Sequence, residues 1–323
     1  MKYEIEEILS PISSQIDNYE LLLQKTLATD SVFIYEITRH LFAKTGKRLR
    51  PGLLFLAAGN VDKQAVILAG VAIELIHVAT LLHDDVIDQS DKRRGQQTVN
   101  ARWSNLVSVL MGDYLFAKSF ALLVQAGVPE LLSSFSQATE RVAKGELNQV
   151  YFTGNFDLNE DEYLKVISDK TASLMSCAAE AGMICADGDR RYLQAMKNFG
   201  EYLGMAFQIT DDILDLVGES TKTGKQLGSD IREGWATLPL IYALRNGGRS
   251  QKDRLIKLHT DGFDPEEFMN LVEFIREEGG IDYADRKARD YSRMAKDIIM
   301  SIPGLEYQAN LCALADFAVA RNM

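Results

Sequence analysis

The sequence predicts an all-α protein, and three observations carry that prediction. Apolar residues recur three and four positions apart along most of the chain, which is the spacing of amphipathic helices. Runs that alternate Val, Ile and Thr, as strands do, are scarce, and the 323 residues include only six prolines. With 46% hydrophobic and 25% charged residues, the composition is that of a globular protein with a sizeable core. Because no repeat, low-complexity tract or linker interrupts the pattern, we expect one all-α domain over residues 1–323.

The expected helices can be followed along the chain. Residues 4–27 place apolar side chains on one helix face, and Pro11 lies early enough to start or break a helix there. Residues 266–302 predict two amphipathic surface helices that are separated at Gly279 and Gly280. Three longer segments are apolar on nearly all sides, which is typical of helices at the centre of a bundle: residues 65–88, 106–127 and 192–218.

Charge and cysteine content exclude some classes of protein. The net charge is −11, which argues against nucleic acid as a partner because a basic surface supplies most of that affinity. The three cysteines lie in apolar contexts, so a framework of disulfide bonds is not expected. This cysteine content is typical of a protein in the reducing cytoplasm. The acidic N-terminus is not a signal peptide, and the longest uncharged runs, such as residues 51–61, are shorter than the ~18 residues of a spanning helix. We therefore expect a soluble cytoplasmic protein without a transmembrane segment.

Two clusters of aspartates end two of the apolar segments: Asp84, Asp85 and Asp88, and then Asp211, Asp212 and Asp215 with the same spacing. Since positions four apart share a helix face, each cluster gathers carboxylates at one helix end. Two such clusters that face each other repel unless cations lie between them, and oxygen-only ligands select hard cations, Mg²⁺ above all. One cluster alone is weak evidence, because most such matches are solvated helix ends. The pair predicts a diphosphate held through magnesium.

Basic residues lie close to these segments in the sequence. Lys47 and Arg50 are three apart and can share a helix face, and an arginine fork suits a phosphate. A solvated charged turn is the alternative interpretation of this pair. Arg93 and Arg94 follow the first aspartates by one or two turns, which is close enough for contact with the same anion.

Three further candidates have weaker signals. His77 lies about two turns before Asp84 and shares its helix face, so whether it binds a ligand or is a satisfied core histidine stays open. Lys170 and Thr171 fall on an expected helix. Lys225 lies in a glycine-punctuated loop, where a lysine can serve in a lid over a diphosphate.

Taken together, these segments closely resemble the trans-isoprenyl diphosphate synthase (polyprenyl synthetase) family. The resemblance runs in order from "GKRLRP" through "ELIHVATLLHDDVIDQSDKRRG", "GDYLFAKSF", "KGELNQ", "KTASL" and "FQITDDILD" to "GKQLGSD" and "EGWATLPL". It implies the isoprenoid synthase fold, an all-α bundle around a deep central apolar cavity with the aspartate motifs facing across its mouth. It also implies an enzyme that repeatedly condenses isopentenyl diphosphate with an allylic diphosphate, such as a farnesyl or geranylgeranyl primer. Magnesium, with Mn²⁺ as a substitute, and a homodimer are implied as well.

The resemblance assigns a role to each candidate. The six aspartates would hold magnesium and the allylic diphosphate, with Asp84, Asp88 and Asp211 as first choices for direct ligands. The allylic diphosphate would also contact Arg93, Lys170 and Lys225. The diphosphate of isopentenyl diphosphate would contact Lys47, Arg50, His77 and Arg94. Thr171 and Gln208 would lie near the reacting carbons.

The implied chemistry suits these residues. Magnesium and the basic groups would stabilise the departing diphosphate and leave an allylic carbocation, which the isopentenyl double bond attacks before a proton is lost. An apolar cavity would exclude water from the cation. The sequence departs from the family in "EGWATLPL", where Trp235 stands in place of the usual lysine and removes one expected cation.

Product length in this family depends on bulk along the helix before the first aspartates. Here Ala79 and Thr80 are small, so we expect an open floor and a product of hexaprenyl to decaprenyl length. Ile76 lies deeper. The final stop is expected among bulky residues of two later segments: Leu115, Phe116, Tyr151 and Phe152. The apolar product also suggests peripheral contact with a membrane during release.

Two alternatives remain. One is a short-chain farnesyl or geranylgeranyl diphosphate synthase, and another is a non-catalytic partner subunit, which Trp235 leaves open. A terpene cyclase shares the acidic helix ends, but it has no use for a second basic set.

Overall fold

The computed structural model describes residues 4–43, 46–93, 95–186, 188–218, 227–247, 249–261 and 264–320. The predicted all-α fold is confirmed. Within these ranges the only strands are β1 (Lys92–Arg93) and β2 (Gln96–Gln97), which pair antiparallel with Lys92 opposite Gln97. This small hairpin follows directly after the first aspartate motif.

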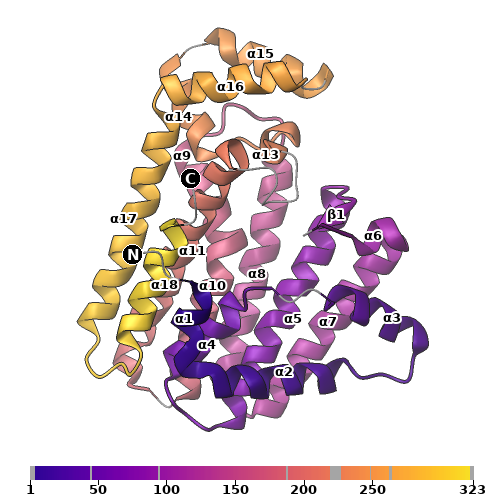
Figure 1. Ribbon diagram of the computed structural model, residues 1–323, viewed down its shortest axis with the longest axis vertical. Helices are drawn as coiled ribbons and strands as arrows, with labels where there is room; N and C mark the ends of the chain where they lie inside the picture. Colours follow the sequence, from indigo (N-terminus) through magenta and orange to yellow (C-terminus); the bar gives the residue numbers. More distant parts are fainter. Residues whose placement is uncertain are drawn as a thin grey trace.

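Pro11 divides the first predicted helix. It lies in η1 (Ser10–Ile12), a single 3₁₀ turn, because proline cannot donate the backbone hydrogen bond that a continuous helix needs. The N-terminal helices are α1 (Ile5–Leu9), α2 (Ser13–Leu27) and α3 (Val32–Leu41). In Figure 1 α3 extends sideways from the bundle, below the β1 hairpin.

Six helices build the centre of the bundle: α4 (Leu49–Ala58), α5 (Gln64–Ile87), α7 (Asn105–Ala126), α8 (Pro129–Phe152), α10 (Ser173–Cys185) and α11 (Leu193–Val217). Figure 1 shows them side by side, and α10 packs against α4, α8 and α11. The packing is close where α10 carries Gly182, since a Cβ there would lie 2.3 Å from the Leu54 carbonyl oxygen of α4. The buried apolar side chains form one continuous core.

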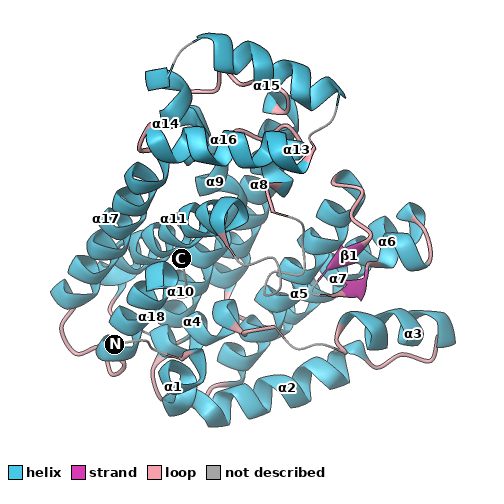
Figure 2. Ribbon diagram, turned by 45° about the horizontal axis from the view of Figure 1, so that its top comes forward, coloured by secondary structure: helices cyan, strands magenta, loops and turns pink. Residues whose placement is uncertain are grey.

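The long helix α17 (Gly280–Ser301) packs on α11 at the side of this bundle. Shorter elements connect and cover the bundle: α6 (Val99–Arg102), α9 (Glu160–Ile167), η2 (Ser168–Ala172), η3 (Arg190–Tyr192), α13 (Ser229–Arg232), α14 (Leu238–Gly247), α15 (Arg249–Asp261), α16 (Pro265–Glu277) and α18 (Gln308–Ala320). The predicted break between the two amphipathic helices is confirmed, because Gly279 adopts φ 76° between α16 and α17. Figure 2 shows α13 to α16 above the ends of the long helices.

Two helices, α5 and α7, are long and apolar enough to cross a membrane by length and composition, although the uncharged runs in the sequence are short. In α5, 67% of the apolar window is buried inside the protein, as in the core helix of a globular protein. The corresponding figure for α7 is 39%, so the prediction that α7 is a buried helix is only half right. One of its faces packs on α5 and the other is exposed and apolar.

Both aspartate motifs lie where long helices end. Asp84 and Asp85 occupy the last turn of α5, and Asp88 is its C-cap. The second motif lies in the last two turns of α11, before the chain continues to α13. The packing of these two helices around the shared core therefore determines how the two motifs face each other.

Candidate active site

Two adjoining cavities lie at the ends of α5 and α11. We call the first the aspartate compartment; it has a volume of about 380 Å³, and Asp88, Gln149, Asp212, Asp215 and Trp235 line it. The second, the basic compartment, has a volume of about 620 Å³ and is lined by Lys47, Arg50, His77, Thr80, Asp84 and Glu146. Five residues line both, so the compartments meet there: Arg93, Lys170, Thr171, Gln208 and Asp211.

The structure thus brings together most of the residues that the sequence singled out. The two aspartate motifs and the basic residues at the start of α4 come from segments far apart in the chain, yet they surround one connected space. His77 lines the basic compartment, so the prediction that it shares a face with Asp84 is confirmed. Two candidates, Arg94 and Lys225, lie outside the described residues.

The aspartates of the first motif differ in their surroundings. Asp85 is buried, lines neither compartment, and accepts a hydrogen bond from Arg93 Nε at 2.7 Å. Asp84 and Asp88 each line a compartment. The buried Oδ1 atom of Asp84 has no hydrogen-bond partner within the described part of the chain. Asp85 therefore orients Arg93, while Asp84 presents an oxygen that is suited to a cation.

All three aspartates of the second motif line the aspartate compartment. Asp212 accepts hydrogen bonds from Tyr163 Oη at 2.6 Å and from Gln208 Nε2 at 2.7 Å. Burial raises the pKa of Asp212 to about 7, against the opposing effect of these two donors. Asp215 accepts a hydrogen bond from Ser229 Oγ at 2.8 Å, at the first residue of α13. The third member, Asp211, lines both compartments.

The donor set fits magnesium in one particular way. Among the described residues, no three His, Cys, Asp or Glu side chains gather closely enough to hold a metal ion by themselves. Magnesium does not require such a cage, since it keeps several waters and is commonly bound through one or two carboxylates and substrate phosphates. The unpartnered Asp84 oxygen and the exclusively oxygen-based donors meet that requirement.

Lys170 and Thr171 lie at the junction of the two compartments. Lys170 Nζ donates to Glu146 Oε2 at 2.8 Å, and Thr171 Oγ1 donates to Gln208 Oε1 at 2.8 Å. Burial lowers the pKa of Lys170, but the carboxylates of Asp84 and Glu146 outweigh it, so the net shift is upward. Lys170 is therefore a positively charged group, fixed by Glu146, in the wall that the two compartments share. Burial, followed by the Asp84 charge, raises the pKa of Glu146 to about 7.

The loop before α4 owes its shape to Arg48. This residue has φ 53° and ψ 31°, a left-handed conformation that is unusual for a residue other than glycine. Its guanidinium donates a hydrogen bond from Nε to the Glu20 carboxylate of α2 at 2.8 Å. The same guanidinium lies 5.6 Å from the ring centroid of Tyr19. Arg48 is thus anchored against α2, and it lines the basic compartment together with Lys47 and Arg50.

Trp235 lines the aspartate compartment, where the family usually has lysine. Its ring is only 5% exposed and stacks on Tyr163 with 6.2 Å between centroids. Because Tyr163 donates to Asp212, the tryptophan supports an aspartate of the second motif and does not supply a charge.

The chain-length candidates are only partly placed in the cavity. Ile76 and Ala79 are fully buried in α5, whereas the Thr80 side chain lines the basic compartment and donates to the His77 carbonyl at 2.8 Å. The four candidates for the final stop differ in exposure: Leu115 is fully buried, Phe116 and Phe152 are half-buried, and Tyr151 is 79% exposed. Gln149, two residues before Tyr151, lines the aspartate compartment, so this end of α8 lies at the mouth and Tyr151 is not part of a floor.

Sequence reasoning gave no role to several residues that the structure places in the site. Glu146 lies within the quoted "KGELNQ", where the residue type alone gave no function. Tyr163 and Ser229 hold aspartates through hydrogen bonds between segments far apart in the chain. No local sequence pattern predicts such a hydrogen bond, because it depends on how α9, α11 and α13 pack against one another.

Comparison with known proteins decides the family. The family described as polyprenyl synthetase matches residues 31–275. The chain belongs to the polyprenyl synthetase family. It is a prenyltransferase that elongates trans-isoprenyl diphosphates.

Three relatives illustrate the range of this family. Octaprenyl diphosphate synthase of Haemophilus influenzae is 35% identical over 99% of this chain and 97% of its own length. A short chain isoprenyl diphosphate synthase of Methanothermobacter thermautotrophicus is 32% identical over 99% of both. The crystal structure of a polyprenyl synthase from Caulobacter crescentus, complexed with calcium and isoprenyl diphosphate, matches with a TM-score of 0.94 and 33% identity, covering 100% of this chain and 99% of that one.

Proposed function

We propose that this polyprenyl synthetase condenses isopentenyl diphosphate with a farnesyl or geranylgeranyl primer to give all-trans products of hexaprenyl to decaprenyl length. The observation that carries the proposal is the meeting of the aspartate compartment and the basic compartment at Lys170, Thr171 and Gln208. Two diphosphates bound on either side of this junction would place their prenyl carbons next to one another.

The allylic diphosphate belongs in the aspartate compartment. Magnesium, or manganese as a substitute, would be held by Asp88 and Asp211 of this compartment and by Asp84 of the adjoining basic compartment, and would neutralise the leaving diphosphate. Lys170 and Arg93 add positive charge from the shared wall, and Asp85 keeps Arg93 in place through its hydrogen bond. The Caulobacter crescentus structure contains calcium together with isoprenyl diphosphate, which supports the use of a divalent ion.

Isopentenyl diphosphate belongs in the basic compartment. Lys47, Arg50 and His77 line it and would hold the second diphosphate, which cannot leave because it is not allylic. Thr171 and Gln208, hydrogen-bonded to one another, face the junction and would position the reacting carbons. The proton lost after the double bond attacks would pass to the departed diphosphate.

We further propose that the protein works as a homodimer in the cytoplasm, with residues 1–323 acting as one domain. The long exposed face of α7 and the neighbouring end of α8 supply an apolar surface for a second copy. None of the three cysteines is in a disulfide, in keeping with a reducing compartment. Release of the apolar product would involve peripheral contact with a membrane.

A product assay tests the proposed reaction. Purified protein would receive farnesyl diphosphate, labelled isopentenyl diphosphate and Mg²⁺, with and without chelator, and the dephosphorylated products would be sized by chromatography. We expect a metal-dependent ladder that ends between hexaprenyl and decaprenyl. Products that stop at farnesyl or geranylgeranyl would instead assign a short-chain synthase.

One further candidate function is favoured by Trp235, which replaces the usual cation of the aspartate compartment. Failure of farnesyl, geranyl and geranylgeranyl primers alike would favour a non-catalytic partner subunit. In that case activity gained by Trp235→Lys would identify the missing charge as the cause.

A further inference from the structure

Lys170 and Thr171 do not lie on a regular α-helix. They belong to η2, a π-helical turn between α9 and α10, in which the Ser173 N–H donates to the Ser168 carbonyl five residues earlier. Single π-helical turns are rare and shift the side chains that follow relative to a continuous α-helix. The direction of Lys170 and Thr171 therefore depends on whatever keeps this turn in its π form.

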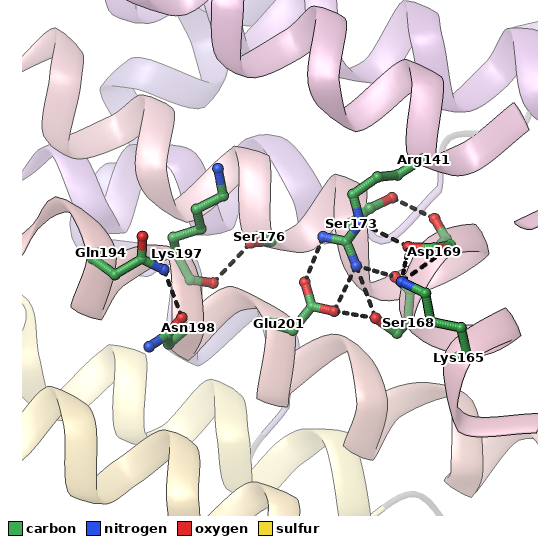
Figure 3. A network of polar contacts seen from close by, with 10 residues as sticks. All are labelled: Arg141, Lys165, Ser168, Asp169, Ser173, Ser176, Gln194, Lys197, Asn198 and Glu201. Carbon is green, nitrogen blue, oxygen red and sulfur yellow. Dashed lines mark hydrogen bonds and ion pairs between the residues drawn. The ribbon is translucent and has the colours of Figure 1, made fainter. Parts of the chain in front are cut away.

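One guanidinium ties the turn to two neighbouring helices. Arg141 of α8 donates from Nε to Asp169 Oδ1 at 2.8 Å, and its two terminal nitrogens donate to the carboxylate of Glu201 on α11 at 2.9 and 2.8 Å. Figure 3 shows these side chains converging on Arg141 from three elements. Neither Arg141, Asp169 nor Glu201 lines the aspartate or basic compartment as we define them.

The same network also reaches the backbone of the turn. Arg141 Nη2 donates to the Ser168 carbonyl at 3.0 Å and to Ser168 Oγ at 2.8 Å. Ser168 Oγ in turn lies 2.5 Å from Glu201 Oε1, and Ser173 Oγ donates to the Asp169 carbonyl at 2.6 Å. The carbonyls of the first two residues of the turn thus accept side-chain hydrogen bonds, which an ordinary helix would not need.

Glycines let both neighbouring helices press directly on the turn. A Cβ on Gly145 of α8 would lie 2.4 Å from the Lys170 backbone nitrogen, and a Cβ on Gly204 of α11 would lie 2.5 Å from Ala172 Cα. Any larger residue would push the turn away. The turn is therefore clamped by backbone contacts on two sides and by Arg141 through polar contacts.

We propose that Arg141, Asp169 and Glu201 form a positioning network that fixes the π-turn and so aims Lys170 and Thr171 at the departing diphosphate. The three residues act through Lys170 and do not touch substrate. The role of Lys170 at the diphosphate rests on the proposed function. The claim that the network stabilises the π-helical turn does not depend on that function. Asp169 is 1% exposed and forms ion pairs with Arg141 and with Lys165, whose Nζ lies 3.1 Å away.

Arg141→Lys is the variant that tests the network. Lysine keeps the charge but is a compact point charge without the planar fork, so it cannot serve Asp169, Glu201 and Ser168 together. We expect kcat to fall on the order of a hundredfold, since small misplacements of positioned groups have effects of that size. The KM for isopentenyl diphosphate should stay unchanged, because Lys47 and Arg50 are untouched.

Hydrogen exchange supplies a readout that does not depend on activity. In Arg141→Lys, amides of residues 168–173 should exchange faster, while those of α5 and α17 keep the wild-type rate. Arg293→Lys is the matched control, because Arg293 forms an exposed pair with Asp290 on α17 and should change neither kcat nor exchange. If Arg141→Lys does not fold, Glu201→Gln, which keeps the size of the side chain, is expected to loosen the same amides.

The outcomes separate the possibilities. Wild-type kcat and wild-type exchange in Arg141→Lys would overturn the proposal. Faster exchange throughout the molecule would also overturn it, since the network would then be a general stabilising element. If the wild-type protein transfers no prenyl group, the proposed function fails on its own. Local loosening of residues 168–173 would in that case still support the holding of the turn.

Discussion

At the scale of single residues, aspartates of the same motif have different tasks because their hydrogen-bond partners differ. Asp85, Asp212 and Asp215 accept hydrogen bonds from Arg93, Tyr163 and Ser229, and these bonds fix the walls of the site. Asp212 and Asp215 also line the aspartate compartment, together with Asp88 and Asp211, and Asp84 lines the basic compartment. The sequence spacing is identical in the two motifs, so the hydrogen-bond partners of each carboxylate depend on its surroundings and not on the motif.

A substitution in the first motif tests whether Asp84 is a metal ligand. Asp84→Asn should lower the Mg²⁺-dependent rate on the order of a hundredfold or more, because a preorganised charge that stabilises the leaving group is lost. Binding of Mn²⁺ together with inorganic pyrophosphate, followed by electron paramagnetic resonance, should weaken in parallel. Asp161→Asn is the control, since Asp161 is an exposed aspartate in the first turn of α9. Unchanged metal binding in Asp84→Asn would argue against Asp84 as a ligand.

At the scale of elements, α5 serves both the core and the site. Its central turns are fully buried, while His77, Thr80 and Asp84 reach the basic compartment from one face. Ala79 lies on a buried part of the same helix, one turn before the first aspartates. Bulk added there lies about 7.5 Å along the helix from Asp84, in the path of a growing prenyl chain if the floor is open.

The expected effect is on product length. Ala79→Phe should shorten the longest product, and Ala79→Leu should shorten it less, as measured by chromatography of the dephosphorylated products. The leucine variant matters because a phenylalanine in a packed core can destabilise the fold. Ala65→Phe at the other end of α5 is only partly buried and should leave the product unchanged. Wild-type product length in both Ala79 variants would mean that the floor lies elsewhere.

At the scale of the whole molecule, α7 and α8 carry large apolar side chains that are exposed to solvent. The N-terminal part of α7 and the C-terminal part of α8 carry large exposed side chains: Leu106 at 67%, Leu110 at 57%, Leu147 at 72% and Val150 at 52%. The two helices follow each other through a short connection, so these opposite ends lie at the same end of the bundle. Apolar groups gathered in this way are typical of a protein interface.

A charge placed in this surface tests the proposed homodimer. Leu147→Asp is expected to shift the protein from dimer to monomer in sedimentation velocity, because an unpaired carboxylate is costly to bury in an interface. Met300→Asp is the matched control, since Met300 is 67% exposed on α17, away from α7 and α8. A dimer that persists in Leu147→Asp would place the interface on another face.

The sequence by itself determined the helical architecture, the ends of the long helices and the residue types of the site. Those features follow from local spacing: three- and four-residue periodicity, helix-breaking Pro11 and Gly279, and carboxylates four apart. Only the tertiary structure decided which side chains donate hydrogen bonds to Asp85, Asp212 and Asp215, and where Trp235 lies. It also decided that Tyr151 is at the mouth of the site and that Lys170 belongs to a π-helical turn, which Arg141 contacts. The physical reason is that hydrogen bonds and close packing between distant segments depend on the relative placement of helices, and a single chain's periodicity does not contain that information.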